Sequence, residues 1–286
     1  MVPQDVLDEF FRYVQNEIPI RLIYVKEMRL VDRYFVQQYY LGSIKTMTEK
    51  DVGTSVQSST RVWRVSKMVQ DVVKYDILSH RWLPQGEPTV RDMMDGTAAW
   101  TLGYAKLLKF CAAADSDFVW SDTYCIDKSS SSELDESIRS MFKWYRNSTT
   151  CIVHLAQTTR LADMGNDEWF ERGWTLQELL APRVIKFYNA NWYPFMHGGA
   201  NDKYNKKMTE RLASATGCSG DEFRYLVPGP FKVDQRMSWA AKRKTTRAED
   251  MAYSLMGMFD VIIQPAYGEG GGKSFLPTCQ GDHVVE

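Results

Sequence analysis

The sequence lacks the closely spaced cysteines and histidines that hold a structural zinc ion. Its 286 residues include 5 cysteines and 4 histidines, but no Cys-x-x-Cys pair. We therefore expect no metal site. Cys111 and Cys151 fall within apolar patterns, which predicts buried, reduced thiols. An odd number of scattered cysteines indicates a reducing intracellular setting, and we expect a cytoplasmic protein.

Long hydrophobic runs and an excess of one charge are also missing. Residues 1–19 are interrupted by Asp, Glu and Arg, which excludes a signal peptide, and no apolar run approaches membrane-spanning length. The formal net charge of −1 gives no electrostatic reason to expect a nucleic acid or an anionic membrane as a partner. Hydrophobic residues make up 44% of the chain, which is sufficient for a large core.

Two common catalytic motifs are absent. There is no Gly-x-Ser-x-Gly elbow, and Ser79 and His80 are neighbours on an expected strand, where their side chains point to opposite faces. We therefore do not expect a Ser-His-Asp hydrolase. The run Gly268–Ser274, GEGGGKS, does not match the phosphate-binding loop pattern GxxxxGK[ST]. We expect it to open an irregular tail.

Short apolar runs that end in polar and aromatic residues indicate buried strands. Tyr75–Trp82 reads YDILSHRW, and Phe118–Lys128 repeats this form. Thr150–Ala156 and Val184–Tyr188 are two further expected strands. Helical patterns separate the strands, and this alternation predicts a mostly parallel α/β sheet covered by helices on both faces.

Two helices between these strands have apolar residues at helical spacing. They are expected over Tyr104–Cys111 and Leu134–Tyr145. For the second we expect a capping box that joins Ser132 to Asp135.

Ligands of parallel sheets bind beyond the carboxyl ends of the strands. This rule locates a site without naming its reaction. The binding residues that we expect at this edge are Ser79, His80, Arg81, Trp82, Asp122 and Asp127.

The composition changes along the chain and predicts four parts. We expect an N-terminal extension at 1–71, the α/β core at 72–195, a C-terminal helical part at 196–270 and an irregular tail at 271–286. The segments expected within the first and third parts are a helix at Val6–Glu17, strand character at 21–33, a polar loop or hairpin at Lys45–Thr60, a helix at Met208–Thr216 closed by Gly217, and helices at Ser238–Lys244 and Ala248–Phe259.

The stretch Glu171–Pro182, ERGWTLQELLAP, is the most informative part of the chain. On a helix, Trp174 and Glu178 lie one turn apart on one face, while the leucines form a packing surface on the opposite face. The tryptophan and the carboxylate then face either open solvent or a cleft that uses both.

A single carboxylate suits cleavage of an N-glycosidic bond to a cationic base, as in NAD, because the nicotinamide leaves as a neutral molecule. The carboxylate stabilises the developing oxocarbenium ion, an aromatic side chain binds the base, and cations bind the phosphates. Glu178 is the candidate carboxylate, with Trp174 or Trp82 as the aromatic surface. Arg81 or Arg172 is the candidate phosphate donor.

Several long motifs follow one another in a fixed order over about residues 72–270. They read YDILSHRW, FVWSDTYCIDK with SSSELDESIRSMFKWYR, WFERGWTLQELLAP, and MSWAAKRKTTRAEDMAYSLMGMFDV with YGEG. This set resembles the fungal heterokaryon incompatibility (HET) domain, and RLIYVKEMRLVDR is similar to the segment that precedes such domains. The resemblance implies a role in fungal non-self recognition, in which these domains are effectors of programmed cell death.

The order of ILSHRW, a second strand, an amphipathic helix, a third strand and a W-x-x-x-E-L segment also resembles, more distantly, the TIR domain. This resemblance implies a flavodoxin-like sheet. TIR domains that cleave NAD carry their catalytic glutamate in a W-C-x-x-E-L segment. Trp174, Glu178 and Leu179 match that segment, and Thr175 replaces the cysteine. The resemblance therefore implies that Glu178 is the catalytic residue.

The helical region 208–270 has no counterpart in TIR domains, so part of the pocket must be built differently. We expect this region to fold as a cap over the strand ends. The basic run Lys242–Arg247 is read as a solvated connection, a phosphate ligand or a partner of Asp250. The further expected binding residues are Arg172, Trp239, Arg243, Arg247 and Asp250.

Two functions from different classes remain open at this point. In the first, the chain hydrolyses NAD or a related nucleotide without a cofactor, and the depletion kills the cell. In the second, it is a death-signalling module that assembles with like domains or an activating receptor, and Trp174 and Glu178 are interface residues. A third option is a degenerate copy that retains the fold alone.

Overall fold

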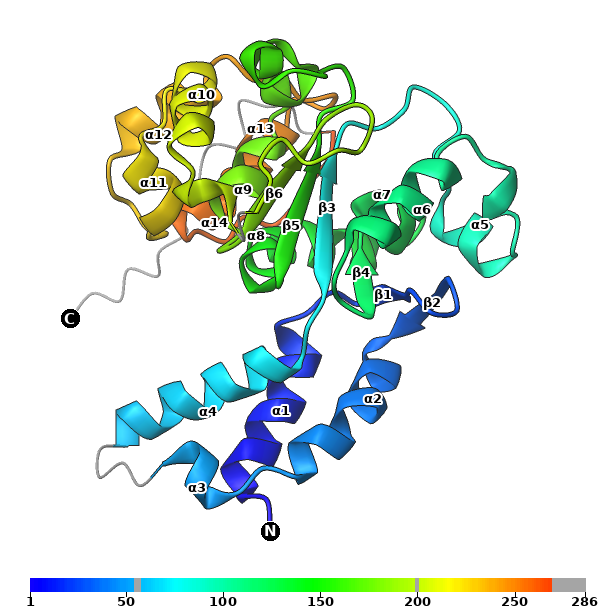
Figure 1. Ribbon diagram of the computed structural model, residues 1–286, viewed down its shortest axis with the longest axis vertical. Coiled ribbons are helices and arrows are strands. Elements are labelled where there is room, and N and C mark those ends of the chain that lie inside the picture. The colour runs from blue at the N-terminus through cyan, green and yellow to red at the C-terminus, as the bar shows by residue number, and fades with distance from the viewer. Residues whose placement is uncertain (54–57, 199–200, 269–286) are drawn as a thin grey trace, which may run out of the picture.

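A six-stranded, mostly parallel sheet lies at the centre of the molecule and is flanked by helices (Figure 1). The computed structural model describes residues 1–53, 58–198 and 201–268. The strands in spatial order are β2 (Arg29–Asp32), β1 (Arg21–Tyr24), β4 (Phe118–Trp120), β3 (Asp76–His80), β5 (Thr150–His154) and β6 (Ile185–Tyr188).

The four strands β4, β3, β5 and β6 run parallel to one another. In chain order their arrangement is 2-1-3-4, as in a flavodoxin-like sheet. The expected α/β class is thereby confirmed. The chain leaves β3 toward one side for β4 and returns to the other side for β5. Ligand sites of such sheets lie at this change of direction, beyond the strand ends.

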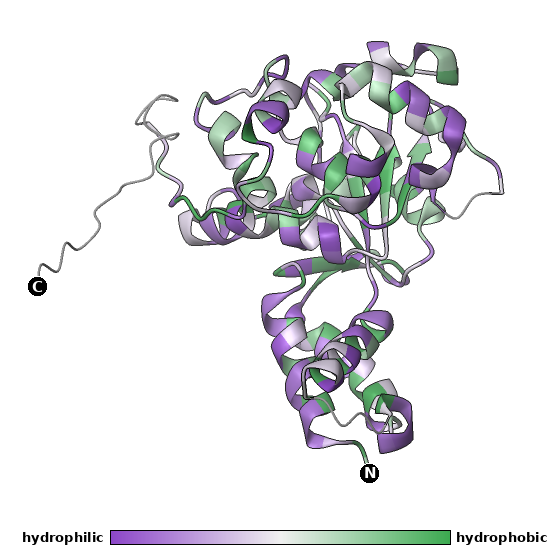
Figure 2. Cartoon of the chain, turned by 90° about the vertical axis from the view of Figure 1, so that its left-hand side faces the viewer, coloured by the Kyte–Doolittle hydropathy of each residue, from purple (hydrophilic) through white to green (hydrophobic). Residues whose placement is uncertain are grey.

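Both faces of the central strands are covered. Every residue of β3 and β5 is buried, whereas β6 alternates between buried and half-buried residues at the sheet edge. All four strands expected in this region are present, although each is shorter than its apolar run. Figure 2 shows the hydrophobic strands inside the fold and hydrophilic residues on the outer helices.

The N-terminal part adds a hairpin to the same sheet. β1 pairs antiparallel with β2 and with β4, so that Ile23 lies opposite Val119. The expected strand character of residues 21–33 is confirmed. The helices α1 (Gln4–Asn16), α2 (Arg33–Lys45) and α4 (Ser58–Val72) pack together on the side of the sheet away from the strand tips (Figure 1).

The prediction of a loop or hairpin at Lys45–Thr60 is wrong in part. The helix α3 (Glu49–Val52) forms there, and α4 begins at Ser58. Thr48 and Asp51 form a reciprocal capping box, which supplies partners for backbone N–H groups at the start of α3. Local capping therefore gives this polar segment helical structure.

The two predicted core helices are present as α6 (Tyr104–Ala113) and α8 (Ser131–Asn147). The capping box at Ser132 and Asp135 is wrong. Ser130 caps α8 by accepting from the backbone N–H of Glu133. The run of serines before the helix offers several possible caps, and sequence alone does not select among them.

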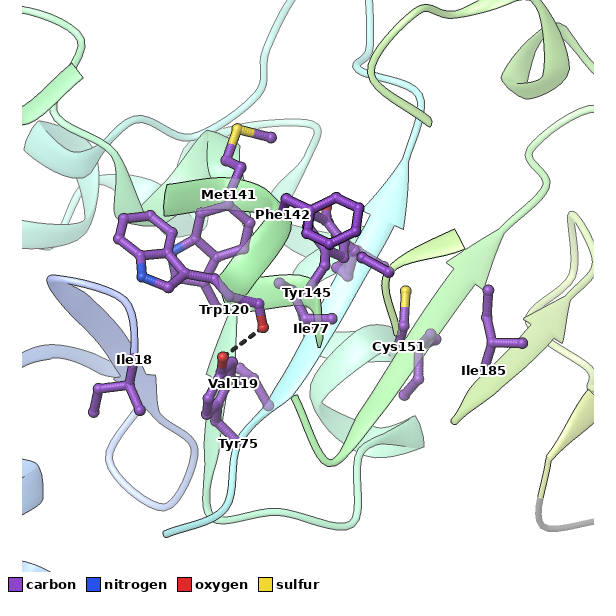
Figure 3. Packing of buried hydrophobic residues seen from close by; sticks show 14 of the residues in the cluster. Ile18, Tyr75, Ile77, Val119, Trp120, Met141, Phe142, Tyr145, Cys151 and Ile185 are labelled. Atoms are coloured by element: carbon purple, nitrogen blue, oxygen red, sulfur yellow. Dashed lines mark hydrogen bonds between the residues drawn. The ribbon is translucent and has the colours of Figure 1, made fainter. Parts of the chain in front are cut away.

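Large aromatic side chains fill the layer between the sheet and α8 (Figure 3). Trp120 of β4 meets Trp144 edge to face, with ring centroids 5.7 Å apart. The hydroxyl of Tyr75 donates to the carbonyl of Trp144, and Tyr145 donates to the carbonyl of Leu78 at 3.0 Å. These bonds satisfy the phenol groups inside the core.

The C-terminal part is helical, as expected, with different boundaries. α10 (Lys206–Thr216) ends at Gly217, whose φ of 77° allows the left-handed cap that the sequence predicts. The prediction of one helix at Ala248–Phe259 is wrong, because α13 (Asp250–Tyr253) and α14 (Met256–Phe259) are separate. The remaining helices and 3-10 turns are α5 (Val90–Met94), η1 (Ala98–Trp100), α7 (Asp122–Cys125), η2 (Leu161–Asn166), η3 (Glu168–Glu171), α9 (Thr175–Leu180), η4 (Asp202–Tyr204), α11 (Gly220–Tyr225) and α12 (Val233–Ala240).

The predicted helix at Ser238–Lys244 is also wrong, because α12 starts earlier and ends at Ala240. Beyond it, the chain pairs with the segment that leads into α9, and Lys244 forms a parallel bridge with Arg172. No helix among the described residues is long and apolar enough to cross a membrane. The predicted tail at 271–286 lies outside the described residues.

Candidate functional site

A cavity of about 320 Å³ lies beyond the carboxyl ends of β3 and β4. This volume falls within the range of small-molecule sites. Segments from the α/β core and from the C-terminal helical part both line it. The expected site residues that line the cavity are Trp82, Asp122, Arg172, Trp174, Arg247 and Asp250.

The C-terminal wall is joined to the core by backbone hydrogen bonds. The N–H of Gly173 donates to the carbonyl of Lys244 at 2.8 Å, and the N–H of Lys244 donates to the carbonyl of Glu171 at 2.6 Å. Gly173 also lies close to Thr245, whose Cγ2 would be 2.5 Å from an added Cβ. The residues after α12 are thus fixed beside the start of α9.

Apolar residues also line the cavity. They come from the segment after α7, from α8 and from the residue that precedes α9. A planar or apolar ligand group can pack against this surface without leaving a buried polar atom unpaired. We call these residues the apolar wall: Ile126, Leu134, Ile138, Met141 and Trp174.

Trp82 contacts one acidic and two basic side chains of the cavity. Its indole Nε1 donates to Oδ2 of Asp122 at 2.9 Å. The Nζ of Lys128 lies 3.5 Å from the ring centroid, and the guanidinium carbon of Arg172 lies 5.4 Å from it. Both cations are therefore within cation–π range of one ring.

Tyr267 makes an equivalent arrangement from the C-terminal part. Its hydroxyl donates to Oδ1 of Asp250 at 2.9 Å, and the guanidinium carbon of Arg247 lies 4.2 Å from its ring centroid. Burial raises the pKa of Asp250, while hydrogen bonds from Tyr267 and Trp174 oppose this change. The basic run forms no ion pair with Asp250 among the described residues; Arg247 and Asp250 both contact Tyr267 instead.

Glu178 lies neither in open solvent nor on the cavity surface. Glu178 lies on α9, and the residue is 5% exposed. The Ser79 hydroxyl donates a hydrogen bond to its Oε2. The Ser79 oxygen in turn accepts from Nε1 of Trp169 at 2.8 Å. All six residues of α9 are buried, so the expected division into a leucine face and an open face is wrong.

The surroundings of Glu178 favour its protonated form. Burial and the charge of Asp122 raise its pKa to about 8, although the Ser79 hydrogen bond and the Arg172 charge act in the opposite direction. Asp122 and Arg172 both line the cavity. The carboxyl group is therefore electrostatically coupled to the cavity and is largely neutral at pH 7.

The other expected site residues do not line the cavity. Arg243 is buried and donates at 2.8 Å to the carbonyl of Arg172 and to the Thr175 hydroxyl, so it supports the start of α9. Trp239 is buried in the core cluster. Arg81 pairs with Glu168 at 2.6 Å. Asp127 accepts from the backbone N–H of Ser129 at 2.9 Å.

Ser79 and His80 point to opposite faces of β3, as the sequence predicts, so they do not form a nucleophile and base. His80 stacks parallel to Tyr124 with ring centroids 6.4 Å apart. Neither ring nitrogen of His80 has a hydrogen-bond partner among the described residues. Burial and the charge of Lys106 lower the pKa of His80, which keeps its ring neutral.

Sequence reasoning missed three residues of this site. Lys128 and Tyr267 line the cavity, and both fall within motifs that the sequence displays, at the end of FVWSDTYCIDK and at the start of YGEG. Trp169 is linked to Glu178 through Ser79, and its spacing from Ser79 carries no local signal. Only the tertiary fold brings it there.

No group of His, Cys, Asp and Glu in the described parts of the chain is arranged to hold a metal ion. Cys111, Cys125, Cys151 and Cys218 are free and buried, which confirms the buried thiols expected at Cys111 and Cys151. Cys279 lies outside the described residues.

Residues 75–164 match the model of a family described as Heterokaryon incompatibility protein (HET). The chain is also 40% identical over 216 residues to "Vegetative incompatibility protein HET-E-1" of Podospora anserina. The alignment covers 70% of this chain and 15% of that protein, so the chain corresponds to a small part of its relative. No solved structure matches the chain.

Proposed function

Because this chain belongs to the heterokaryon incompatibility (HET) family, we propose that it acts in vegetative incompatibility as an effector of cell death. We further propose that its cavity hydrolyses the N-glycosidic bond of NAD or a related nucleotide. The observation that carries this proposal is the position of Glu178, a buried acid coupled to the two cavity residues Asp122 and Arg172. The resemblance to TIR domains is a prediction from the sequence, and it agrees with this enzymatic proposal.

The reaction needs Glu178 as a carboxylate. A cationic pyridinium ring bound in the cavity favours the ionised form, because a positive charge nearby lowers the pKa of a carboxyl group. The bond between C1′ of the ribose and the ring nitrogen then breaks, and its electron pair leaves with neutral nicotinamide. Water adds to the oxocarbenium carbon and gives a proton to the Glu178 carboxylate.

The cavity residues supply the remaining interactions. Trp174 and Trp82 provide aromatic surfaces for the base, and Arg172 provides a cation for a phosphate. Glu178 is buried and does not line the cavity, so side chains between them must move before the carboxylate can reach the ribose. Arg172 has no ion pair among the described residues that would hold it in place.

Nicotinamide release from NAD by the purified protein, in dilute and in artificially clustered form, tests the enzymatic proposal. We expect release by the wild-type protein and none by Glu178→Gln. Glu210→Gln is the matched control, because Glu210 is exposed on α10 and remote from the cavity lining. No release under any condition, or equal release by Glu178→Gln, removes the enzymatic proposal.

A second candidate function is a signalling module that works by self-association, with or without an activating receptor. The observation that favours it is the excursion between β3 and α6, where Met94, Trp100 and Leu102 are 66%, 88% and 76% exposed. Cell killing that survives Glu178→Gln but is lost in Trp100→Ser with Leu102→Ser supports this function. Killing that depends on Glu178 alone argues against it.

A further inference from the structure

Three basic side chains of the cavity have no acidic partner. Lys128, Arg172 and Arg247 all line it, and none forms an ion pair with a carboxylate in the described parts of the chain. Lys128 and Arg247 are exposed and Arg172 is half-buried, so all three keep contact with water. Their charges are therefore available to an anionic ligand that enters the cavity.

The two carboxylates of the cavity form no salt bridge with these cations among the described residues, although Asp122 acts electrostatically on Lys128 and Asp250 on Arg247. Asp122 accepts the indole N–H of Trp82, and Asp250 accepts the hydroxyl of Tyr267. Each carboxylate thus orients an aromatic ring, and the ring face holds a cation: Lys128 on Trp82 and Arg247 on Tyr267. The aromatic rings therefore position the two cations, which form no salt bridge among the described residues.

The same arrangement occurs twice, in unrelated parts of the chain. The first set comes from the segments that follow β3 and β4, and the second from the C-terminal helical part. A ring fixed by a carboxylate restricts the motion of the cation that lies on it, which lowers the entropic cost of binding an anion. Four basic and two acidic side chains line the cavity, so it also attracts anions as a whole.

We propose that Lys128, Arg172 and Arg247 form the phosphate-binding side of this cavity, and that its ligand is a phosphorylated molecule with a planar, largely apolar group. The apolar wall takes that group, and the guanidinium groups bind phosphate oxygens in pairs. A free phosphate ion leaves the wall uncovered, so a nucleotide fits better than phosphate alone. The inference rests on the proposed function and specifies its ligand, but it does not require any bond to be cleaved.

Binding of AMP, ADP, adenosine and inorganic phosphate to the Glu178→Gln protein tests this inference, with tryptophan fluorescence or calorimetry as the readout. This variant separates binding from turnover. We expect ADP and AMP to bind at least about tenfold more tightly than adenosine, because hydrogen bonds to charged groups contribute that much or more. We also expect the affinity for AMP to fall as the salt concentration rises.

Two further variants identify the binding side. Lys128→Gln combined with Arg247→Gln is expected to weaken AMP binding about tenfold or more while adenosine binding changes little. Arg211→Gln is the matched control, since Arg211 is exposed on α10 and outside the cavity. Thermal unfolding of each variant checks that the fold is intact.

The possible outcomes separate this inference from the enzymatic proposal. Equal binding of AMP and adenosine, or AMP binding that is unchanged in the folded double variant, overturns the phosphate assignment. Phosphate-dependent binding supports the assignment even where the wild-type protein releases no nicotinamide. Nicotinamide release that is insensitive to the double variant overturns the assignment and leaves the enzymatic proposal standing.

Discussion

The hydroxyl of Ser79 at the end of β3 donates a hydrogen bond to the carboxyl group of Glu178 in α9, 99 positions later in the chain. The same oxygen accepts from the indole N–H of Trp169 at 2.8 Å. Ser79 therefore holds Glu178 in position and is itself held by Trp169, and its hydrogen bond favours the ionised form of Glu178. Ser79 and Trp169 are positioning residues in this arrangement.

Replacing Ser79 by alanine is expected to lower the free energy of unfolding by about 1–3 kcal/mol, because the indole N–H of Trp169 loses its partner inside the core. The pKa of Glu178 also rises, since the Ser79 hydrogen bond is one of the interactions that lower it. Urea denaturation measures the first effect. A shift of the pH profile of nicotinamide release to higher pH measures the second.

Ser148→Ala is the control for this substitution. Ser148 is also buried, and its hydroxyl donates to the backbone carbonyl of Tyr145 at 2.8 Å and not to Glu178. Its loss is expected to reduce stability without moving the pH profile. An identical pH profile for wild-type protein and Ser79→Ala contradicts the positioning role.

Stability is expected to depend on pH through Glu178. Its pKa is about 8 in the folded protein, against an ordinary value of 4.5 in the unfolded chain. The folded state therefore binds the extra proton between these values, and the contribution of Glu178 to stability is complete below pH 4.5 and is lost as the pH rises toward 8. The slope is at most about 1.4 kcal/mol per pH unit.

Glu178→Gln isolates this contribution, because glutamine does not titrate. Denaturation of both proteins across this pH range measures the difference between their free energies of unfolding. We expect the variant to gain stability relative to wild type as the pH rises, and the gain to level off above pH 8. A difference that does not change with pH contradicts a neutral, buried Glu178.

Catalysis should have the opposite dependence on pH. The enzymatic proposal requires the Glu178 carboxylate, so kcat/KM for NAD is expected to rise with pH through the pKa of about 8 in the free protein. Once the cationic substrate is bound, the pKa is lower, and kcat is expected to reach its plateau at a lower pH. Steady-state kinetics at several pH values measure both. Profiles that fall as the pH rises rule out a catalytic carboxylate with this pKa.

The packing of α14 on α8 depends on the absence of a side chain at Gly257. An added Cβ would lie 2.1 Å from Cβ of Phe142, so Gly257→Ala is expected to destabilise the protein by about 1–3 kcal/mol or more. Gly42→Ala is the matched control, because an added Cβ on α2 meets nothing within 4 Å. It should stabilise the protein by about 0.5–1 kcal/mol. Thermal unfolding distinguishes the two, and equal effects would refute the packing argument.

The sequence predicts the α/β core well because its strands carry their own signal. The runs at Tyr75–Trp82 and Thr150–Ala156 each contain adjacent apolar residues, which on a strand point to opposite faces, and both faces are buried. The helical stripe over Leu134–Tyr145 is equally local. These patterns arise from short-range periodicity, so they do not depend on knowing the tertiary fold.

The site was harder to predict because long-range contacts define it. Glu178 reads as a polar residue on a short helix, yet it is buried, because α9 packs against β3, α8, α11 and η3. Arg81 and Asp127 are at the expected strand ends, but each is engaged by a nearby residue away from the cavity. The sequence does not single out Lys128, since only its contact with the Trp82 ring gives it a role.

The bridge between Arg172 and Lys244 has a practical consequence for dissecting this protein. The region that matches the family ends at residue 164, before either of these residues and before Glu178. A fragment that ends there keeps most of the sheet but lacks every cavity residue from Arg172 onward. Expression boundaries should therefore extend past Tyr267, whose hydroxyl donates a hydrogen bond to Asp250 in the C-terminal part of the cavity.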